Sequence, residues 1–306
     1  MSEIPPRAFS APAGGKAAES SYLNRDEACA KARALFAEKE ISLAIFKDLR
    51  DAESKTLPGY SEDEIRTDVA LAARLRGKYE ASDDDSKKYS DILEAVIFKC
   101  GKDNLWFGAN STAIKTAPFD DFVNHVDLVV ETEVADQEYS HLALGVDVTF
   151  SGDLREKFNK IRTAIDKGEL GHVKYFLSDR PDPNHPDLEE PMKFAGPLTN
   201  IPWVVVGIEI ARAKELGLLW MNNKNTQLGK HPAQRMILRQ IALELKTFAG
   251  YARRIGRENL AVILETQLKK VEEIMGEKRA AGIKVIESDR VFEEIKNNLA
   301  AFEAPN

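Results

Sequence analysis

The feature that most constrains the fold is a run of five strand-like segments in the middle of the chain. They are LWFGANSTAI, VNHVDLVVET, HLALGVDVTF, HVKYFLS and IPWVVVGIEI, and they lie between residues 105 and 210. Each is rich in β-branched and aromatic residues and is bounded by polar or Gly/Pro-containing segments, as strands are. In the third, every second residue from Leu142 to Phe150 is apolar, which is typical of a strand with one buried face. The sequence therefore predicts a central β-sheet.

Helical patterns precede, interrupt and follow these strands. The 3.6-residue periodicity predicts helices at 25–53, 61–80 and 86–100, and again from residue 209 to the end apart from a short IKVI segment at Ile283. A further helix lies between the third and fourth strands, where Asp153 and Glu156 have capping-box spacing and Gly168 marks the end. Its apolar stripe consists of Leu154, Phe158, Ile161 and Ile165. The order helix, three strands, helix, strand, loop, strand predicts an α/β core.

The chain divides by composition into four parts. Residues 1–24 are rich in Pro, Ala, Gly and Ser and are expected to form a disordered tail, without the pattern of a secretory signal. We expect a helical N-terminal region at 25–82, the α/β core at 83–210 and a helical C-terminal region at 211–306.

Composition indicates a cytoplasmic protein. Nothing in the 306 residues approaches the ~20 apolar residues of a membrane span. Two cysteines, Cys29 and Cys100, are too few for a disulfide framework and are expected to be buried thiols in a reducing compartment. The net charge of −7 gives no general attraction to nucleic acid. Motifs for nucleotide hydrolysis, dinucleotide binding and serine hydrolysis are absent. The tryptophans, expected in the core, are Trp106, Trp203 and Trp220.

Two aspartates in neighbouring strands suggest a metal site. If the second and third strands form an antiparallel hairpin with Glu133 opposite His141, Asp127 lies directly across from Asp147. Carboxylates about 4.5–5.5 Å apart repel each other unless a cation lies between them or one is protonated. Mg²⁺ would resolve this repulsion. Alternatively, the pair lies at an exposed strand end, or an odd register separates the two.

The same segment resembles a known family. The order αβββαβ, with an acid in the second strand and an (Asp/Glu)-x-Lys motif in the third, is similar to the PD-(D/E)XK nuclease-like superfamily over about Ser86–Phe176. Asp127 matches the first acid and the sequence Asp147-Val148-Thr149 matches the second motif. The stretch also resembles conserved bacterial proteins of uncharacterised activity. The resemblance implies a restriction-endonuclease-like core with a central mixed sheet, and phosphodiester cleavage by Mg²⁺ held by the two acids.

The chain departs from the family pattern at its lysine. Thr149 stands in that position, and threonine supplies neither charge nor a useful base. Some family members carry the lysine on the following helix, where Lys157 is the best replacement and Lys160 lies farther round. His125 is another candidate base or ligand. The family also sometimes places a glutamate on the first helix, as Glu94 is here.

Two other acids precede the second strand. Asp120 and Asp121, in the sequence PFDD, replace Asp127 in the site if the family alignment is displaced by a few residues. The alternative is a turn stabilised by local side-chain hydrogen bonds.

One segment is strongly basic. Lys230–Arg257 contains seven Lys or Arg residues and one acid, Glu244. On a helical wheel the basic side chains form a stripe opposite the apolar face, which is typical of a phosphate-contacting helix. The alternatives are an exposed helix face, or pairing with the acidic N-terminal helices. The stripe consists of Arg235, Arg239, Lys246 and Arg253.

Together these patterns predict a DNA- or RNA-binding protein with a metal-dependent phosphodiesterase site. Asp127 and Asp147 would hold Mg²⁺, with Lys157 and His125 as the other catalytic residues. The alternative is a catalytically inactive relative that acts as a binding or scaffold module, which Thr149 favours. A third reading is a helical adaptor whose α/β core is only structural.

Overall fold

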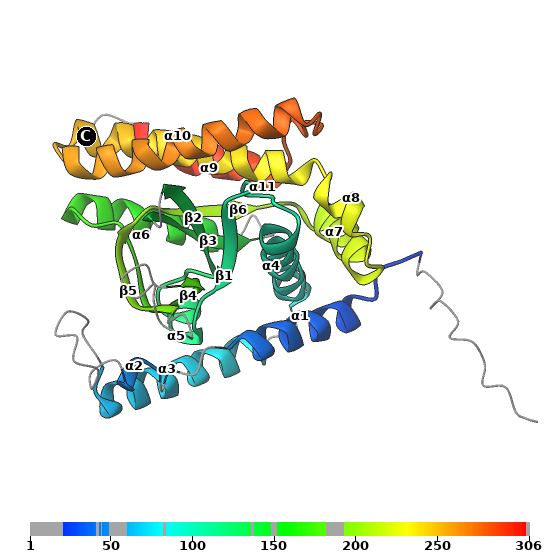
Figure 1. The fold of residues 1–306 in the computed structure, drawn as a ribbon, viewed down its shortest axis with the longest axis horizontal. Coiled ribbons are helices and arrows are strands. Elements are labelled where there is room, and N and C mark those ends of the chain that lie inside the picture. The colour runs from blue at the N-terminus through cyan, green and yellow to red at the C-terminus, as the bar shows by residue number, and fades with distance from the viewer. Residues whose placement is uncertain are drawn as a thin grey trace, which may run out of the picture.

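The computed structural model describes residues 21–40, 43, 45–48, 60–81, 84–135, 138–147, 152–181 and 193–303. Most of the predicted tail at 1–24, and Thr149, lie outside these residues, and so does the side chain of Asp147. The predicted mixed α/β fold with helical regions at both ends is confirmed (Figure 1).

A four-stranded mixed sheet forms the centre of the molecule. Its strands lie in the order β1 (Ser111–Lys115), β2 (Leu128–Ala135), β3 (Glu138–Asp147) and β6 (Trp203–Gly207). The first three are antiparallel to one another, whereas β6 runs parallel to β3. The carboxyl ends of β3 and β6 therefore lie at the same edge of the sheet, next to the beginning of β2.

One predicted strand does not join this sheet. HVKYFLS was expected in the central sheet, but β4 (Gly171–Pro181) pairs instead with β5 (Lys193–Ile201) in a separate two-stranded sheet. The chain reaches β6 only after this ribbon. All five residues of β6 are buried, so its apolar sequence WVVVG suits a strand covered on both faces. A strand at β5 was not predicted at all.

The N-terminal helices lie along one side of the strands (Figure 1). Within this group α4 packs on β1, β2 and β3, and α1 packs on α4. The helix predicted at 25–53 ends early, because Glu40 adopts an extended conformation with ψ of 121°. PFDD forms a short helix in place of the turn considered above. The bounds are α1 (Arg25–Lys39), α2 (Ile45–Asp48), α3 (Glu62–Glu80), α4 (Asp85–Asp103) and α5 (Pro118–Phe122).

Helix α6 (Gly152–Lys167) connects β3 to β4 and follows the prediction closely. The chain leaves it at Gly168, which has φ of +86°. Burying its apolar stripe contributes roughly 1.5–3 kcal/mol per large side chain, and Phe158 packs against Phe248 and Phe302. All four predicted stripe residues are buried: Leu154, Phe158, Ile161 and Ile165.

Helices α9, α10 and α11 lie on the other side of the strands, whereas α7 packs on α4 (Figure 1). Helix α9 also covers the outer edge of β6. There Gln240 accepts a hydrogen bond from the Gly207 amide at 3.0 Å and donates to its carbonyl at 2.7 Å, and Glu244 accepts from the Val205 amide at 2.8 Å. These side chains replace a neighbouring strand and close the edge. The bounds are α7 (Ile210–Met221), α8 (Asn225–Gly229), α9 (Ala233–Arg254), α10 (Glu258–Ala280) and α11 (Arg290–Glu303).

One continuous hydrophobic cluster runs from α1 through the sheet to α11. As predicted, the three tryptophans and both cysteines are buried. Burial raises the pKa of the Cys29 thiol to about 11 and that of Cys100 to about 12, so both are held as neutral thiols. In the described part of the chain, no helix combines the length and apolar character needed to cross a membrane.

Candidate functional site

A large polar cavity lies where β3 and β6 end. Its volume is about 760 Å³, and α4, α6 and the segment before β2 contribute most of its walls. In α/β proteins, ligands bind preferentially in crevices at the carboxyl ends of strands. Six candidate residues from the sequence line it: Glu94, Asp121, His125, Asp127, Lys157 and Lys160.

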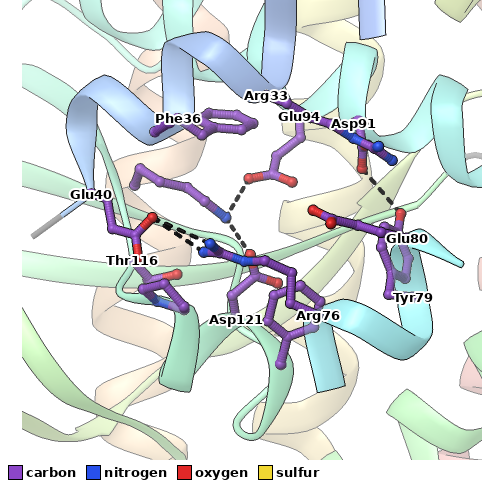
Figure 2. Close-up of a pocket in the computed structure, with 14 residues that line it drawn as sticks. Arg33, Phe36, Glu40, Arg76, Tyr79, Glu80, Asp91, Glu94, Thr116 and Asp121 are labelled. Carbon is purple, nitrogen blue, oxygen red and sulfur yellow. Dashed lines mark hydrogen bonds and ion pairs between the residues drawn. The ribbon is translucent and has the colours of Figure 1, made fainter. Parts of the chain in front are cut away.

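Three carboxylates meet on one wall of this cavity. Glu94 comes from the middle of α4, Asp121 from α5, and Asp127 from the residue before β2. Each offers an oxygen within 4.8 Å of the others, so the group could hold a metal ion. Figure 2 shows Glu94 and Asp121 directed toward each other from separate elements.

Lys115, at the end of β1, lies against this cluster. Its Nζ is 2.6 Å from Glu94 Oε1 and 2.6 Å from Asp121 Oδ2, and its side chain is only 9% exposed. Burial alone would lower the pKa of this ammonium, but Asp121 and Glu94 outweigh burial and raise it. Lys115 is therefore a permanent positive charge between two of the three acids.

Two of the three carboxyl groups, those of Glu94 and Asp127, have raised pKa values and hold protons more strongly than usual. Burial raises the pKa of Glu94 well above its ordinary value, against the opposing effect of Lys115. Burial, followed by the charge of Asp121, raises the pKa of Asp127 to about 7. Such shifts gather at functional sites, where like charges are brought together out of water.

Backbone hydrogen bonds fix Asp127 in place. Its Oδ2 accepts from the Val146 amide at 2.5 Å, and its own amide donates to the Leu144 carbonyl at 2.9 Å. The carboxylate is thus held at the cavity by the last residues of strand β3, although Asp127 itself precedes β2.

The same cavity also carries positive charge, from Lys157 and Lys160. Lys160 Nζ donates to His125 Nε2 at 2.6 Å and pairs with Glu156 at 2.9 Å. Burial and then the charges of Lys160 and Lys157 lower the pKa of His125, so its ring is neutral. A β-carbon placed on Gly145 would lie 3.9 Å from Lys157 Nζ, so this ammonium stands over strand β3. Lys157 and Lys160 both face the cavity from α6.

The predicted hairpin register is wrong by two residues. His141 lies opposite Glu131, not Glu133, because the strands continue almost to the turn, with a bulge between Glu133 and Ala135. Asp127 therefore bonds to the backbone of Leu144 and Val146 instead of standing across from Asp147. The parity of the register is even, as predicted. Asp147 itself ends β3 beside Gly207, and its part in a metal site remains a prediction because its side chain lies outside the described residues.

The two acids of PFDD have different roles. Asp121 joins the carboxylate cluster, as the displaced alignment would require. Asp120 is fully buried and accepts hydrogen bonds from the Lys174 and Tyr175 amides at 2.6 and 2.9 Å, which ties α5 to β4. Asp120 is therefore a structural acid.

The basic stripe of α9 is partly engaged within the molecule. Arg235 donates to the Ile283 carbonyl at 2.7 Å, and Arg239 to the Ile286 and Glu287 carbonyls, so both hold the segment before α11. Arg253 pairs with Glu258 and Glu265. Lys246 is exposed. A role for the stripe in binding nucleic acid remains a prediction.

Sequence reasoning missed Lys115 and gave Glu94 and Asp121 only secondary roles. A lysine that ends the short strand STAIK has the pattern of an exposed strand end, and only the packing of α4 and α5 around it reveals its burial.

Comparison with known proteins identifies no relative. No family model, curated protein or solved structure matches this chain. The class that fold and site define is a mixed α/β protein with a carboxylate-lined cavity at the end of its sheet.

Proposed function

We propose that this protein binds nucleic acid and hydrolyses its phosphodiester bonds with the help of Mg²⁺, and that α4 to β6 form a variant of the nuclease-like core. The observation that carries this proposal is the meeting of three carboxylate oxygens within 4.8 Å of one another on a cavity that two lysines also line. Carboxylates bind the metal and ammonium groups bind phosphate in such sites.

The residues present fit a hard divalent cation. Glu94, Asp121 and Asp127 offer the oxygen ligands that Mg²⁺ prefers. The raised pKa values of Glu94 and Asp127 show that the buried acids lack full compensation for their charge, which a cation would supply. Asp147 remains a predicted additional ligand. When bound, Mg²⁺ would activate a water molecule and neutralise charge on the phosphate.

The two lysines that line the large cavity, Lys157 and Lys160, would orient the substrate. Lys157, over β3, faces the acids and would contact the phosphate as negative charge develops on it. Lys160 would turn from His125 to a second phosphate oxygen. His125 Nε2, which accepts the Lys160 hydrogen bond before substrate arrives, would then be available to accept a proton.

A second candidate is the catalytically inactive binding or scaffold module. The observation that favours it is Lys115, whose ammonium already neutralises part of the carboxylate cluster without a metal. In this candidate the cavity binds a strand and does not cut it.

Cleavage assays with active-site variants separate the two. Labelled single-stranded DNA, duplex DNA and RNA are incubated with the protein in Mg²⁺, Mn²⁺ or EDTA. Asp127→Asn keeps the shape of the side chain and removes its charge, and we expect at least a 10³-fold loss of the metal-dependent rate, about 4 kcal/mol of activation free energy. Glu133→Gln, on the same hairpin but outside the cavity, is the matched control and should cleave normally.

The contrary results are equally clear. Cleavage that survives Asp127→Asn, or that needs no metal, contradicts the assigned site. Binding of a strand without cleavage under any metal condition establishes the inactive module instead.

A further inference from the structure

A second, smaller cavity lies on the other side of the carboxylate cluster. Its volume is about 250 Å³, and it is enclosed by α1, α3, α4 and the β1–α5 connection. Glu94 and Asp121 form part of the wall of both cavities, together with Tyr79, Asp91 and Phe122. Figure 2 shows Phe36, Arg76, Glu94 and Asp121 among the side chains that line this cavity. Whatever fills it therefore lies next to the proposed metal ligands.

The walls of the small cavity combine aromatic rings with planar hydrogen-bonding groups. Phe36 comes from α1, Tyr79 from α3 and Phe122 from α5, and the guanidinium of Arg76 lies 6.0 Å from the Phe122 ring. Arg76 is also held by Glu40 at 3.3 Å. Rings and guanidinium planes of this kind stack on flat, neutral ligands.

The polar groups at this cavity are arranged rigidly. Arg33 donates to Asp91 at 2.8 Å, and the Tyr79 hydroxyl donates to the other oxygen of Asp91 at 3.1 Å. Figure 2 shows Tyr79 and Asp91 joined in this way. Donors and acceptors fixed by one another suit recognition of a hydrogen-bonding edge.

The charge of the lining argues against a phosphate in this cavity. Acids outnumber bases among the side chains that line it, and each of its three bases is already paired with one of these acids, so none is left to bind an anion. The volume is also below the ~300–1,000 Å³ of sites for larger organic ligands. A small, flat, neutral group with hydrogen-bonding edges is the ligand that fits. The acids are Glu40, Glu80, Asp91, Glu94 and Asp121, and the bases are Arg33, Arg76 and Lys115.

We propose that the small cavity is a nucleobase subsite, which receives the base next to the phosphodiester bond that is cut. This inference rests on the proposed function. Lys115 links the carboxylate cluster to the small cavity, since its Nζ contacts Glu94 and Asp121 and also lies 5.0 Å from the centre of the Phe36 ring.

The substrate class follows from this subsite. A base reaches a recessed pocket only when it leaves its stack and its pairing partner. The helical N-terminal region therefore selects unpaired strands, and an intact duplex is a poor substrate. The remaining sugar–phosphate backbone would lie in the large cavity, against Lys157 and Lys160.

Binding without cleavage tests the subsite directly. The affinity of the full-length protein is measured in EDTA for a short labelled single strand, for a sugar–phosphate oligomer of the same length without bases, and for a duplex. We expect the single strand to bind at least tenfold more tightly than the other two. DNA and RNA versions are both measured.

Two variants locate the effect. Phe36→Ala should weaken binding of the single strand about tenfold and leave binding of the base-free oligomer unchanged. Because Phe36 also packs on Phe98, Arg76→Gln, at the rim of the cavity, provides a second variant less exposed to folding defects. Arg66→Gln is the matched control, since Arg66 lies on the same helix with its side chain 75% exposed and outside the cavity.

The outcomes distinguish the two proposals. Base-dependent binding that both cavity variants weaken supports the subsite even if no cleavage is ever seen, in which case only hydrolysis fails. Metal-dependent cleavage that is equally fast on duplex, and insensitive to Phe36→Ala and Arg76→Gln, overturns the subsite and leaves the proposed hydrolysis intact.

Discussion

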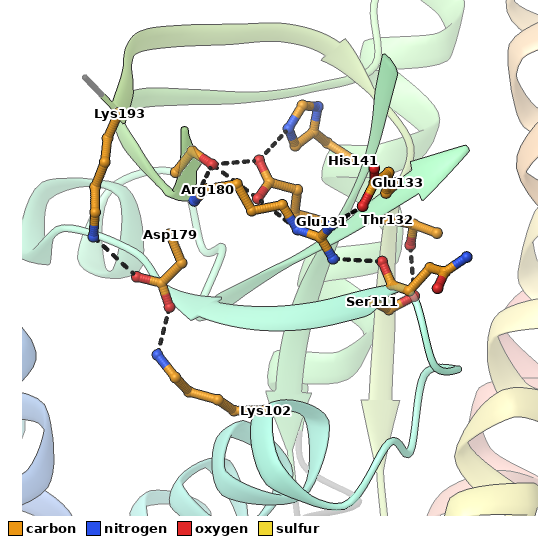
Figure 3. A network of polar contacts seen from close by, with 11 residues as sticks. Lys102, Ser111, Glu131, Thr132, Glu133, His141, Asp179, Arg180 and Lys193 are labelled. Atoms are coloured by element: carbon orange, nitrogen blue, oxygen red, sulfur yellow. Dashed lines mark hydrogen bonds and ion pairs between the residues drawn. The ribbon is translucent and has the colours of Figure 1, made fainter. Parts of the chain in front are cut away.

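A buried acid, Glu131, lies within the β2–β3 hairpin, and a cluster of partly buried acids lies beside its open end; the two are held in different ways. Glu131 is 1% exposed; Ser178 donates to its carboxylate at 2.9 Å, and His141 Nε2 lies 3.2 Å from it (Figure 3). Arg180 adds a charge 3.8 Å away and also pairs with Glu133. In the cluster, Glu94, Asp121 and Asp127 crowd one another beside two cavities.

The contrast separates a structural acid from a candidate functional one. The Glu131 carboxylate is surrounded by donors from β3 and β4 and ties the four-stranded sheet to the β4–β5 ribbon. Buried groups that are fully hydrogen-bonded stabilise one arrangement of the chain. The cluster of Glu94, Asp121 and Asp127 instead holds like charges close together on the wall of a cavity. This arrangement lowers the stability of the folded state and leaves room for a ligand.

Removing Glu131 should have the largest effect on stability. In Glu131→Ala, Ser178 and Arg180 lose their buried partner, and we expect the free energy of unfolding to fall by about 3–5 kcal/mol. Chemical denaturation followed by circular dichroism measures this change. Glu133→Ala, whose side chain is 41% exposed, is the control and should cost less than about 1 kcal/mol. Equal losses in the two variants would remove the distinction drawn for Glu131.

Lys157 provides the matching test at the candidate site. Lys157→Met keeps most of the side-chain volume and removes the charge that faces the acids. We expect the metal-dependent cleavage rate to fall about 10²–10³-fold, roughly 3–4 kcal/mol, while the free energy of unfolding changes by less than about 1 kcal/mol. Arg155→Met, exposed on the same helix, is the control. A large loss of stability with an unchanged rate would assign Lys157 a structural role.

Individual helices and strands could be predicted from the sequence better than the pairing and register of the strands. Strands β2 and β3, the buried stripe of α6 and the burial of the tryptophans follow from local periodicity. Strand β5 does not, because KFAGPLTNI contains Gly and Pro and gains its strand conformation from pairing with β4. The register depends on where the turn begins, and because the strands continue as far as Ala135 and Glu138, the pairing lies two residues from the predicted one.

The site, too, could be predicted only where a sequence pattern marks its residues. Asp127 precedes β2 and Lys157 lies on α6, and the family pattern led to both. Glu94 and Asp121 join them only through the packing of α4 and α5 on the sheet, which no local pattern encodes. Lys115 shows this best, since helices α4 and α5 bring Glu94 and Asp121 to its ammonium group.

The pH dependence of stability should also distinguish the carboxylate cluster from Glu131. The pKa of Asp127 is about 7 in the folded protein, against about 3.9 in an unfolded chain, so between these values the folded state holds an additional proton. Stability should therefore fall as pH rises from about 4 through about 7. The full shift corresponds to at most about 4 kcal/mol, which solvent screening reduces to on the order of 2 kcal/mol.

Asp127→Asn removes this penalty while keeping an oxygen to accept the Val146 amide. We expect the metal-free variant to match the wild type near pH 4 and to be more stable by about 2 kcal/mol at pH 8. Saturating Mg²⁺ at pH 8 should raise the unfolding temperature of the wild type and not that of the variant. Parallel pH profiles for the two proteins would show that Asp127 carries no such strain.

The smallest expected effect concerns the basic stripe of α9. Unlike Glu131, not all of its members are held by partners, and unlike the carboxylate cluster, it does not line either of the two cavities. Arg235, Arg239 and Arg253 have partners within the molecule, so the exposed Lys246 is the member best able to contact a phosphate. If it does, Lys246→Ala should leave the free energy of unfolding within about 0.5 kcal/mol of wild type and lower nucleic-acid affinity a few-fold. Its signature is the salt dependence: the slope of log affinity against log salt should become shallower by about one, equally for all sequences. A slope that does not change would assign the stripe to the attachment of α10 and α11, and would leave the strand-end cavities as the region through which the protein meets nucleic acid.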